Sequence, residues 1–450
     1  MKKFLQSKLF KLVLSAVVGI CLFFFTPICL SKMWLGIIIG SLFLITNLSQ
    51  YISRVAFVTH FFRIFVGGLF IFSGTIKSND PTGFSIKLKE YFEIFTGDVE
   101  GTWLSFLKGL FEYCHDHSVG LSILVCVIEV ACGFMLLIGF KKMFTLWLLI
   151  LQIVFFTFLT FYSACYNKVT HCGCFGDFLV LTPWTSFTKD IILLVSIAFL
   201  FAGKDNIKPL FKKGFVNWGL TGLAIAFSIW FPFFCYNNLP VWDFLPFKNG
   251  TDICKAMEKA PDYKPAKYMS YFKYKNLKTG ESKSFDQDHM PWQDTLTWKY
   301  VDADGEPVLV SKEVGGAKIS SYSLVDFDGN VISDSLLQSK KRYFLLVCWE
   351  LKSMEKNAAL IKKINEFSTA CEKEGVKFLA ITHDDDLAIN KFKFDNQALF
   401  NFARCDDDVT LKMMIRSNPG LMLFNGCTMV RKWHHNNFAA YSDVKDKYFK

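Results

Sequence analysis

Two cysteines separated by a single residue are the part of this sequence best suited to chemistry. Cys172 and Cys174 lie in the run His171-Cys172-Gly173-Cys174-Phe175-Gly176-Asp177, in a short loop between two hydrophobic segments. Thiols at this spacing can close a small, strained disulfide that exchanges with other thiols. They can also bind a soft metal ion, or serve as buried or disulfide-bonded residues that only hold the loop. The residues alone leave all three interpretations open.

A second polar segment offers further metal ligands. It reads Cys114-His115-Asp116-His117. Sulfur and imidazole ligands suit zinc or copper. The sequence assigns no metal, and His115, His117 and His171 are only the candidate ligands for one.

The hydrophobic segments on either side of the cysteine loop belong to a larger set that predicts transmembrane helices. A helix needs about 20 apolar residues to cross the hydrocarbon core of a bilayer. Segments of this kind, with few charges, lie at 11–30, 33–49, 58–76, 118–139, 143–164, 187–203 and 215–235. We therefore expect about seven transmembrane helices, the first of them retained because it lacks the cleavage site of a signal peptide.

The short loops between these segments predict the orientation of the chain. Basic residues concentrate at the N-terminus, around residues 54–63, at 141–142 and at 204–213. The positive-inside rule assigns such loops to the cytoplasm. If all seven segments cross, the N-terminus is cytoplasmic, and the Cys172 loop and everything after residue 236 lie on the outer side. The net charge of +10 therefore reflects loop orientation and does not indicate a nucleic-acid partner.

Residues 77–117 form a long outer loop with helical periodicity. Apolar residues recur at helical spacing in two groups, the first Leu88, Tyr91, Phe92 and Phe95, the second Trp103, Phe106, Leu107, Leu110 and Phe111. Short amphipathic helices that lie on the bilayer surface, or that pack on the helical bundle, both fit this pattern.

The composition changes after residue 236. Residues 237–317 predict a tether with little regular structure followed by small β-hairpins around 268–310. Residues 318–450 predict an α/β domain of three layers, with a buried strand at 343–348, a helix at 354–374, a strand at 377–382 and a final hairpin around 421–424 and 429–433.

Residues 58–203 carry motifs that resemble a known membrane family. They read Arg63-x3-Gly67-x2-Phe70-x2-Ser73-Gly74-x2-Lys77-x2-Asp80-Pro81, then Glu129-x3-Gly133, then Cys172-x-Cys174-Phe175-Gly176-Asp177-x5-Pro183-Trp184-x4-Lys189-Asp190. This region resembles the DoxX/MauE type in its Bacteroidetes form, a four-helix membrane core. Residues 1–57 would then add two transmembrane helices before the core, and residues 204–236 a seventh helix after it.

This resemblance implies a location and two loosely defined activities. Proteins of this type are expected in the bacterial inner membrane, here with a periplasmic C-terminal domain. DoxX-like proteins include a membrane subunit of thiosulfate:quinone oxidoreductase, which makes quinone a possible cofactor. MauE-like proteins are implicated in maturing a disulfide-rich periplasmic dehydrogenase subunit.

Residues 318–450 resemble an exported thioredoxin-like domain of the ResA/TlpA type. The strand Phe344–Trp349 and the later Asn418-Pro419-Gly420-Leu421 carry the likeness. In that fold the proline is cis and borders a peptide-binding groove. Where the family has C-x-x-C, this chain reads Ser353-Met354-Glu355-Lys356, which cannot perform the usual thiol exchange. Ser353, Lys356, Asn418 and Pro419 either form a client-binding groove or only support the fold.

Glu129 lies well inside a predicted transmembrane segment. A charged side chain at this depth is costly and is by default a functional candidate that faces the bundle interior. It can carry a proton, or it can be a neutral carboxyl that bonds a neighbouring helix. Arg63 and Asp190 lie near segment ends on opposite sides, so neither is a secure partner.

Three functions follow as hypotheses, and whether the protein is an enzyme is left open. The first is thiol redox chemistry or protein maturation in the cell envelope, with Cys172, Cys174 and Glu129 as the candidate catalytic residues. The second is a non-catalytic scaffold in which the C-terminal domain binds an envelope protein. The third is a subunit of a quinone-linked sulfur oxidoreductase. In each case the bilayer surrounds the helices, and an envelope protein is the expected partner or client.

Overall fold

The computed structural model describes residues 56–450 except 167, 170–172, 304–307, 312, 356 and 450. The chain divides into two compact units, Met1–Phe244 and Leu245–Lys450, which we call the membrane unit and the C-terminal unit. The predicted transmembrane segments 11–30 and 33–49 lie outside the described residues, as do His171, Cys172 and Lys356.

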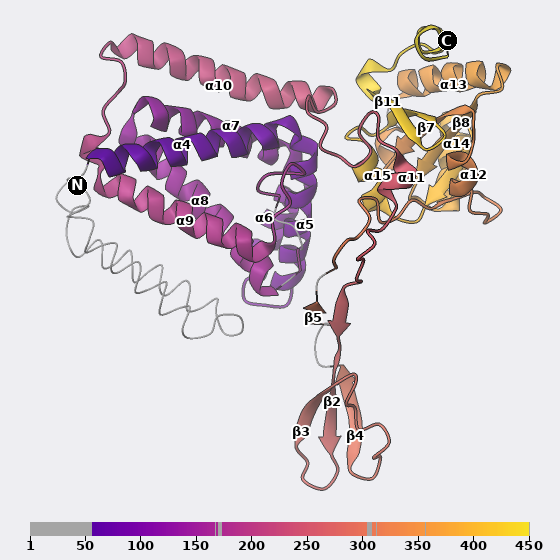
Figure 1. Cartoon of the computed structure of the whole chain (residues 1–450), viewed down its shortest axis with the longest axis horizontal. Coiled ribbons are helices and arrows are strands. Elements are labelled where there is room, and N and C mark those ends of the chain that lie inside the picture. The colour runs from indigo at the N-terminus through magenta and orange to yellow at the C-terminus, as the bar shows by residue number, and fades with distance from the viewer. Residues whose placement is uncertain are drawn as a thin grey trace. The chain divides into compact units, whose positions relative to one another are not determined.

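Five described helices of the membrane unit are long and apolar enough to cross a membrane (Figure 1). They are α4 (Ala56–Asn79), α7 (Ser118–Ile138), α8 (Lys142–Tyr166), α9 (Pro183–Ala202) and α10 (Gly214–Asn237). Each corresponds to a segment predicted from hydropathy, although α4 and α9 extend further than predicted. A multi-pass membrane unit is therefore confirmed, while the total of seven helices stays a prediction.

The helix ends follow local sequence. Thr182 caps α9 by accepting a hydrogen bond from the Thr185 N–H, and Pro183 occupies the first turn. Helix α7 ends at Gly139, whose φ of +70° is the left-handed conformation that glycine tolerates best. Arg63 then binds the last carbonyls of α7, with Nε 2.9 Å from Leu136 O. These contacts fix the lengths and the ends of the helices that carry the site.

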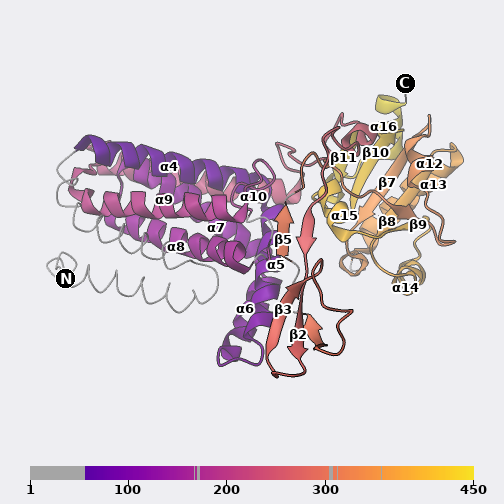
Figure 2. The same cartoon turned by 60° about the horizontal axis from the view of Figure 1, so that its bottom comes forward.

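The predicted outer loop forms two helices with different environments. Figure 2 shows α5 (Pro81–Val99) and α6 (Lys108–Asp116) running across the ends of the long helices. The first apolar group, on α5, is buried against α7 and α8, as the alternative of packing on protein predicts. Most of the second group faces outward: Trp103 is 82% exposed, Phe106 72% and Leu110 54%.

The C-terminal unit contains a six-stranded sheet in the order β11-β10-β7-β8-β9-β6. Its strands are β6 (Leu324–Val325), β7 (Arg342–Cys348), β8 (Lys377–Thr382), β9 (Phe402–Cys405), β10 (Gly420–Asn425) and β11 (Thr428–His434). Strands β7, β8 and β9 are parallel, and β6, β10 and β11 run antiparallel to their neighbours. Strands and helices alternate as the sequence predicts.

Five helices follow β6 among the described residues and accompany this sheet: α12 (Ser333–Leu337), α13 (Ala358–Lys373), α14 (Asp386–Asn396), α15 (Asp408–Met414) and α16 (Tyr441–Tyr448). The predicted helix at 354–374 begins later, because Leu351–Ser353 forms a 3-10 turn and Asn357 caps α13 by accepting from the Leu360 N–H. Phe344 of β7 packs against Phe367 of α13 and Tyr441 of α16 in one apolar core.

The predicted hairpins are present as two small sheets. Strand β1 (Lys267–Met269) pairs with β5 (Val308–Ser311), and β2 (Tyr271–Asn276) lies between β3 (Ser282–Asp286) and β4 (Trp298–Ala303). Gly280 takes the β2–β3 turn with a φ of +77°. Aromatic rings of Tyr274, Phe285, Trp298 and Tyr300 pack together across the three strands and supply the contacts of this small sheet.

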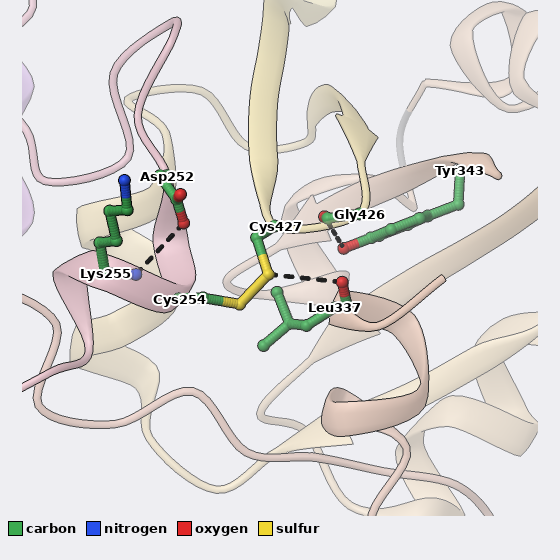
Figure 3. Close-up of a disulfide and its surroundings, with 7 residues drawn as sticks. All are labelled: Asp252, Cys254, Lys255, Leu337, Tyr343, Gly426 and Cys427. Atoms are coloured by element: carbon green, nitrogen blue, oxygen red, sulfur yellow. Dashed lines mark hydrogen bonds between the residues drawn. A yellow bond between two sulfur atoms is a disulfide. The ribbon is translucent and has the colours of Figure 1, made fainter. Parts of the chain in front are cut away.

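The segment predicted as an irregular tether is instead attached to the sheet of the C-terminal unit. Figure 3 shows a disulfide between Cys254, in α11 (Ile253–Ala256), and Cys427, in the turn between β10 and β11. The Ile253 N–H donates to Cys427 O at 2.8 Å, and the Met429 N–H donates to Thr251 O at 2.9 Å. The segment has little regular structure beyond α11, and its attachment depends on a partner 173 residues away in the sequence.

We expect the Cys254–Cys427 disulfide to stabilise the C-terminal unit by about 2–4 kcal/mol, because it closes a very long loop in the unfolded chain. C254S, C427S and the double variant should lose the same amount, since each removes the same bond. Urea unfolding of the full chain, followed by protease resistance of the C-terminal unit, measures the loss. Wild-type stability in the variants, or additive losses in the double variant, would contradict this role.

We expect the exposed apolar residues between α5 and α7 to contact lipid, because Trp103, Phe106 and Leu110 are all exposed and α6 runs across the ends of the spans. In vesicles with brominated lipids, the Trp103 emission, taken as the difference between wild type and W103F, should be quenched. Trp433, obtained through W433F, is the control because it packs on the core of the C-terminal unit. Equal responses from the two residues would exclude specific lipid contact.

Candidate functional site

Glu129 forms a buried ion pair with Lys77 inside the membrane unit. The Lys77 Nζ lies 2.7 Å from both carboxylate oxygens of Glu129. The two side chains are 1% and 4% exposed. The sequence identified Glu129 but missed its partner, because the predicted segment ended at residue 76 and placed Lys77 in a loop. Helix α4 continues to Asn79, so Lys77 lies on the helix and its amine reaches the interior.

Glycines allow α4 and α7 to approach closely enough for this pair. A Cβ at Gly74 would lie 2.9 Å from the Cβ of Glu129 and 2.8 Å from Val130 Cγ2. Two turns earlier on the same face of α4, a Cβ at Gly67 would lie 3.0 Å from Gly133 O. Real Cβ atoms do not tolerate such contacts, so a side chain at either position would push the helices apart. Because Gly74 has no side chain, α7 can approach α4 closely, and Glu129 reaches the Lys77 amine one turn beyond Gly74 on α4.

Aromatic rings line the other side of the Lys77 amine. The Nζ lies 4.3 Å from the centroid of the Phe156 ring and 5.3 Å from that of Phe84. Ring faces attract cations, but they replace only part of the hydration that burial removes. Glu129 must therefore supply most of the compensating charge, and either residue alone would be an unpaired ion in a low-dielectric interior.

A second ion pair lies on α9, with a buried carboxylate and a lysine side chain that is 19% exposed. Lys189 Nζ contacts Asp190 Oδ1, and Asp190 is fully buried. Thr160 of α8 donates a hydrogen bond from its hydroxyl to Asp190 Oδ2 at 2.9 Å. The Lys189 amine also lies 5.4 Å from the Phe175 ring centroid. Asp190 is thus satisfied by its own neighbours and does not pair with Glu129.

The cysteine loop turns back into the bundle next to these charges. Cys174 is 4% exposed and Phe175 7%, while Gly173 and Gly176 adopt φ values of +68° and +50° that permit the tight turn. Ser73 of α4 donates from its hydroxyl to Cys174 O at 3.1 Å. The same hydroxyl lies 3.5 Å from Glu129 Oε1. One side chain therefore touches both the cysteine loop and the Lys77–Glu129 pair.

These groups border a single small cavity. It has a volume of about 10 Å³, which is roughly the room that one water molecule needs. Its polar lining consists of Ser73, Lys77, Glu129, Cys174, Lys189 and Asp190, and its apolar lining comes from Leu69, Phe70, Ile153, Phe156 and Leu193. We call the polar residues the charged cavity cluster. Four segments distant in sequence meet here, with two cations and two carboxylates beside one cysteine.

The remaining signature residues shape helix ends and turns. Asp80 caps α5, its Oδ1 accepting from the Gly83 N–H at 2.8 Å, and Pro81 begins that helix. Pro183 begins α9, and Trp184 is 47% exposed. Asp177 is exposed in the turn that follows Gly176. These positions hold the loop and the helices in place and do not line the cavity.

The candidate metal ligands do not assemble among the described residues. His115 Nδ1 contacts its neighbour Asp116 at 3.1 Å, and the His117 ring stacks on Tyr113 with centroids 4.1 Å apart. Burial raises the pKa of the Cys114 thiol, which disfavours the thiolate that a metal requires. Within the described chain, the one compact group of ligand types is Asp252, Cys254 and Cys427, where the two sulfurs form a disulfide.

The predicted groove residues of the C-terminal unit lie together where the structure describes them. The Asn418–Pro419 peptide bond is cis, as the thioredoxin-like resemblance implies. The Asn418 side chain accepts from the Trp349 N–H at 2.8 Å and donates to Glu350 O at 3.0 Å and Ser353 Oγ at 2.7 Å. Ser353 and Asn418 therefore contact each other, whereas Lys356 lies outside the described residues.

The thiols of the C-terminal unit are poorly placed for exchange chemistry. Burial raises the pKa of Cys348 well above its usual range, that of Cys371 to about 12 and that of Cys405 to about 11. All three side chains are at most 2% exposed. Thiol chemistry in the described C-terminal unit is therefore confined to the Cys254–Cys427 disulfide, so the better thiol candidates remain in the membrane unit.

Comparisons with known proteins agree with this division of the chain. Residues 268–309, which hold the three-stranded sheet, match a family described as a domain of unknown function, DUF8463. No curated protein and no solved structure matches the chain. Residues 55–203 match the family described as methylamine utilisation protein MauE. This match covers α4 to α9 and every residue that lines the cavity, so the helical region that carries the cavity is similar to the MauE family.

Proposed function

We propose that this protein exchanges thiols and disulfides at the outer face of the bacterial inner membrane, in redox control or maturation of exported proteins. Cys172 and Cys174 are the exchanging pair in this proposal. The observation that carries it is the position of Cys174 in the wall of a cavity that two ion pairs also line, each with a buried carboxylate.

The cost of those ion pairs favours a chemical role over a purely structural one. Ionisable side chains within transmembrane helices are rare, and they concentrate at proton or substrate sites. A loop that only needed to be held in place could pack on apolar side chains, and a buried ion pair is weak support for stability by comparison. Charges beside a cysteine can instead control where protons go when a sulfur–sulfur bond opens.

The Cys254–Cys427 disulfide supports the proposed orientation. Structural disulfides form and persist in oxidising compartments such as the periplasm, and they are rare in the cytoplasm. The C-terminal unit would therefore be periplasmic, as the distribution of basic loops predicts. The Cys172 loop would share that side of the membrane, where exported clients are available.

In this proposal the C-terminal unit binds a client or an envelope partner without exchanging thiols itself. The order of its central strands and the cis Asn418–Pro419 bond support the thioredoxin-like resemblance. Ser353 occupies the place where that family has its first active cysteine, and it bonds Asn418 beside the cis proline. A polar contact that cannot be oxidised suits binding better than electron transfer.

That same contact favours the second candidate, a non-catalytic scaffold. If the Cys172 loop is only structural, the membrane unit serves as an anchor and the C-terminal unit as an adaptor for an envelope partner. A quinone-linked sulfur oxidoreductase receives less support, because the cavity beside Cys174 has room for about one water and not for a quinone ring.

Trapping a mixed disulfide tests the thiol proposal. In C174S, Cys172 keeps its thiol but loses the partner that would release a client, so Cys172 should accumulate a mixed disulfide with an exported protein. C172S should accumulate much less, since Cys174 is buried. Non-reducing gels of cells treated with acid and alkylating reagent measure both. C114S is the matched control, because Cys114 lies outside the cavity.

Mixed disulfides that appear equally in C172S, C174S and C114S, or in none of them, would reject thiol exchange and leave the scaffold. Thiol exchange would also be rejected if the C172S/C174S double variant restored full function to cells that lack the gene.

Binding by the C-terminal unit is tested at Asn418. N418A removes three hydrogen bonds that order the turn before Pro419, so capture of the envelope partner should fall by about tenfold. S353A removes one of them and should weaken capture less. Crosslinking in intact cells measures capture, and protease resistance of the C-terminal unit shows whether each variant is folded. Unchanged capture in a folded N418A would argue against a groove here.

A further inference from the structure

One end of the membrane unit carries a concentration of positive charge. This is the end at which α8 and α10 begin, opposite α5 and α6 (Figure 1). Residues 139–147 and 203–218 form it, and their only acidic residue is Asp205, which is 87% exposed. Their lysines are Lys141, Lys142, Lys204, Lys208, Lys212 and Lys213. This end of the bundle therefore attracts anions.

Packing joins the two segments into a single surface. The Leu210 N–H donates to Ile138 O at 2.8 Å. The buried Arg63 guanidinium donates to Leu137 O at 2.6 Å and to Lys208 O at 3.2 Å. Lysines that are far apart in the sequence thus lie on neighbouring loops at the same end of the bundle.

Four of these lysines are exposed, and we call them the basic patch: Lys141, Lys208, Lys212 and Lys213. The other two are only half-buried but have partners within the protein. The Lys142 amine donates to Lys204 O at 2.7 Å and lies 3.9 Å from Asp205. The single carboxylate at this end therefore faces Lys142 and leaves the charge of the basic patch in excess.

Exposed apolar side chains border the basic patch. Leu210 is 65% exposed, Phe215 74% and Trp218 60%. The Lys141 Nζ lies 5.5 Å from the centroid of the Trp218 ring, which packs edge-on against Phe140. Phe215 and Trp218 belong to the first turns of α10, a helix apolar enough to cross a membrane. A ligand at this place meets cations on one side and an apolar surface on the other.

We propose that the basic patch binds the headgroup of an anionic phospholipid, whose acyl chains lie along the beginning of α10. Lysine ammonium groups attract the phosphate, and the exposed rings of α10 contact the chains. A free phosphate ion would use the lysines but leave the apolar border without a role, so the lipid is the better ligand. The inference does not depend on thiol exchange.

The position of Lys141 distinguishes a binding patch from lysines that only orient the chain. The positive-inside rule is satisfied by a lysine anywhere in these loops. Lys141 instead has a φ of +46°, a conformation that glycine or asparagine adopts at lower cost. Turn geometry thus does not favour lysine here, whereas a ligand for its charge does.

The test compares two brominated lipids around the full-length protein in nanodiscs. The bromine is placed either on phosphatidylglycerol or on the same mole fraction of phosphatidylcholine, in otherwise identical bilayers. Trp218 emission is the difference between wild type and W218F. Each lysine near an anionic lipid typically strengthens attraction about fivefold, so half-maximal quenching of Trp218 should need about tenfold less brominated phosphatidylglycerol, or less still. Trp184, 47% exposed at the start of α9, should respond equally to both lipids.

Charge variants assign this preference to the basic patch. K141N should lower it about fivefold, and asparagine suits the turn, so the variant should fold. K212Q/K213Q should bring it close to equality, whereas K212R/K213R keeps both charges and should resemble wild type. K89Q is the matched control, because Lys89 is an exposed lysine on α5 at the other end of the bundle. Circular dichroism in nanodiscs reports whether each variant keeps its helices.

Three results would overturn lipid binding at the basic patch. The first is equal quenching of wild-type Trp218 by the two lipids, and the second is an unchanged preference in folded K141N and K212Q/K213Q. The third is a preference that inorganic phosphate abolishes at constant ionic strength, since the site would then take a free anion. A preference that weakens equally in any salt, as charge screening requires, supports the lipid.

Discussion

The constraint on which the membrane unit depends is that charges buried between apolar helices must be paired. Lys77 and Glu129 satisfy it across α4 and α7, with an amine 2.7 Å from both carboxylate oxygens. Removing one partner of such a pair typically costs 3–5 kcal/mol, because the other is left as an unpaired ion. The glycines at the α4–α7 contact, the aromatic rings around Lys77 and the Ser73 hydroxyl all surround this pair. The cysteine loop then packs over the same place.

The two units meet the demands of their environments in different ways. In the membrane unit, apolar side chains face outward and polar ones gather at the cavity, as a bilayer requires. In the C-terminal unit, a mixed sheet buries its apolar residues between helices, and a disulfide fixes the preceding segment to the sheet. Its described free thiols are buried, so its redox chemistry is limited to that one structural bond.

Sequence reasoning succeeded where the signal is local. The long apolar segments predicted the positions of α4, α7, α8, α9 and α10, because hydropathy over about 20 residues reports membrane crossing directly. The alternating strands and helices after residue 318 and the hairpins near 268–310 were also predicted, because apolar periodicity and turn residues are local signals. Glu129 was identified because a carboxylate within an apolar segment is conspicuous.

The sequence by itself determined which residues are charged, which are thiols and which segments are apolar enough to enter a membrane. Only the tertiary structure decided which of them meet. Lys77 was a loop residue in the prediction and is the partner of Glu129 in the fold, because α4 extends past it and Gly74 brings α7 close. Cys254 and Cys427 are 173 residues apart, a separation at which no local pattern indicates pairing. Ion pairs and disulfides depend on distances of a few ångströms, and packing sets those distances.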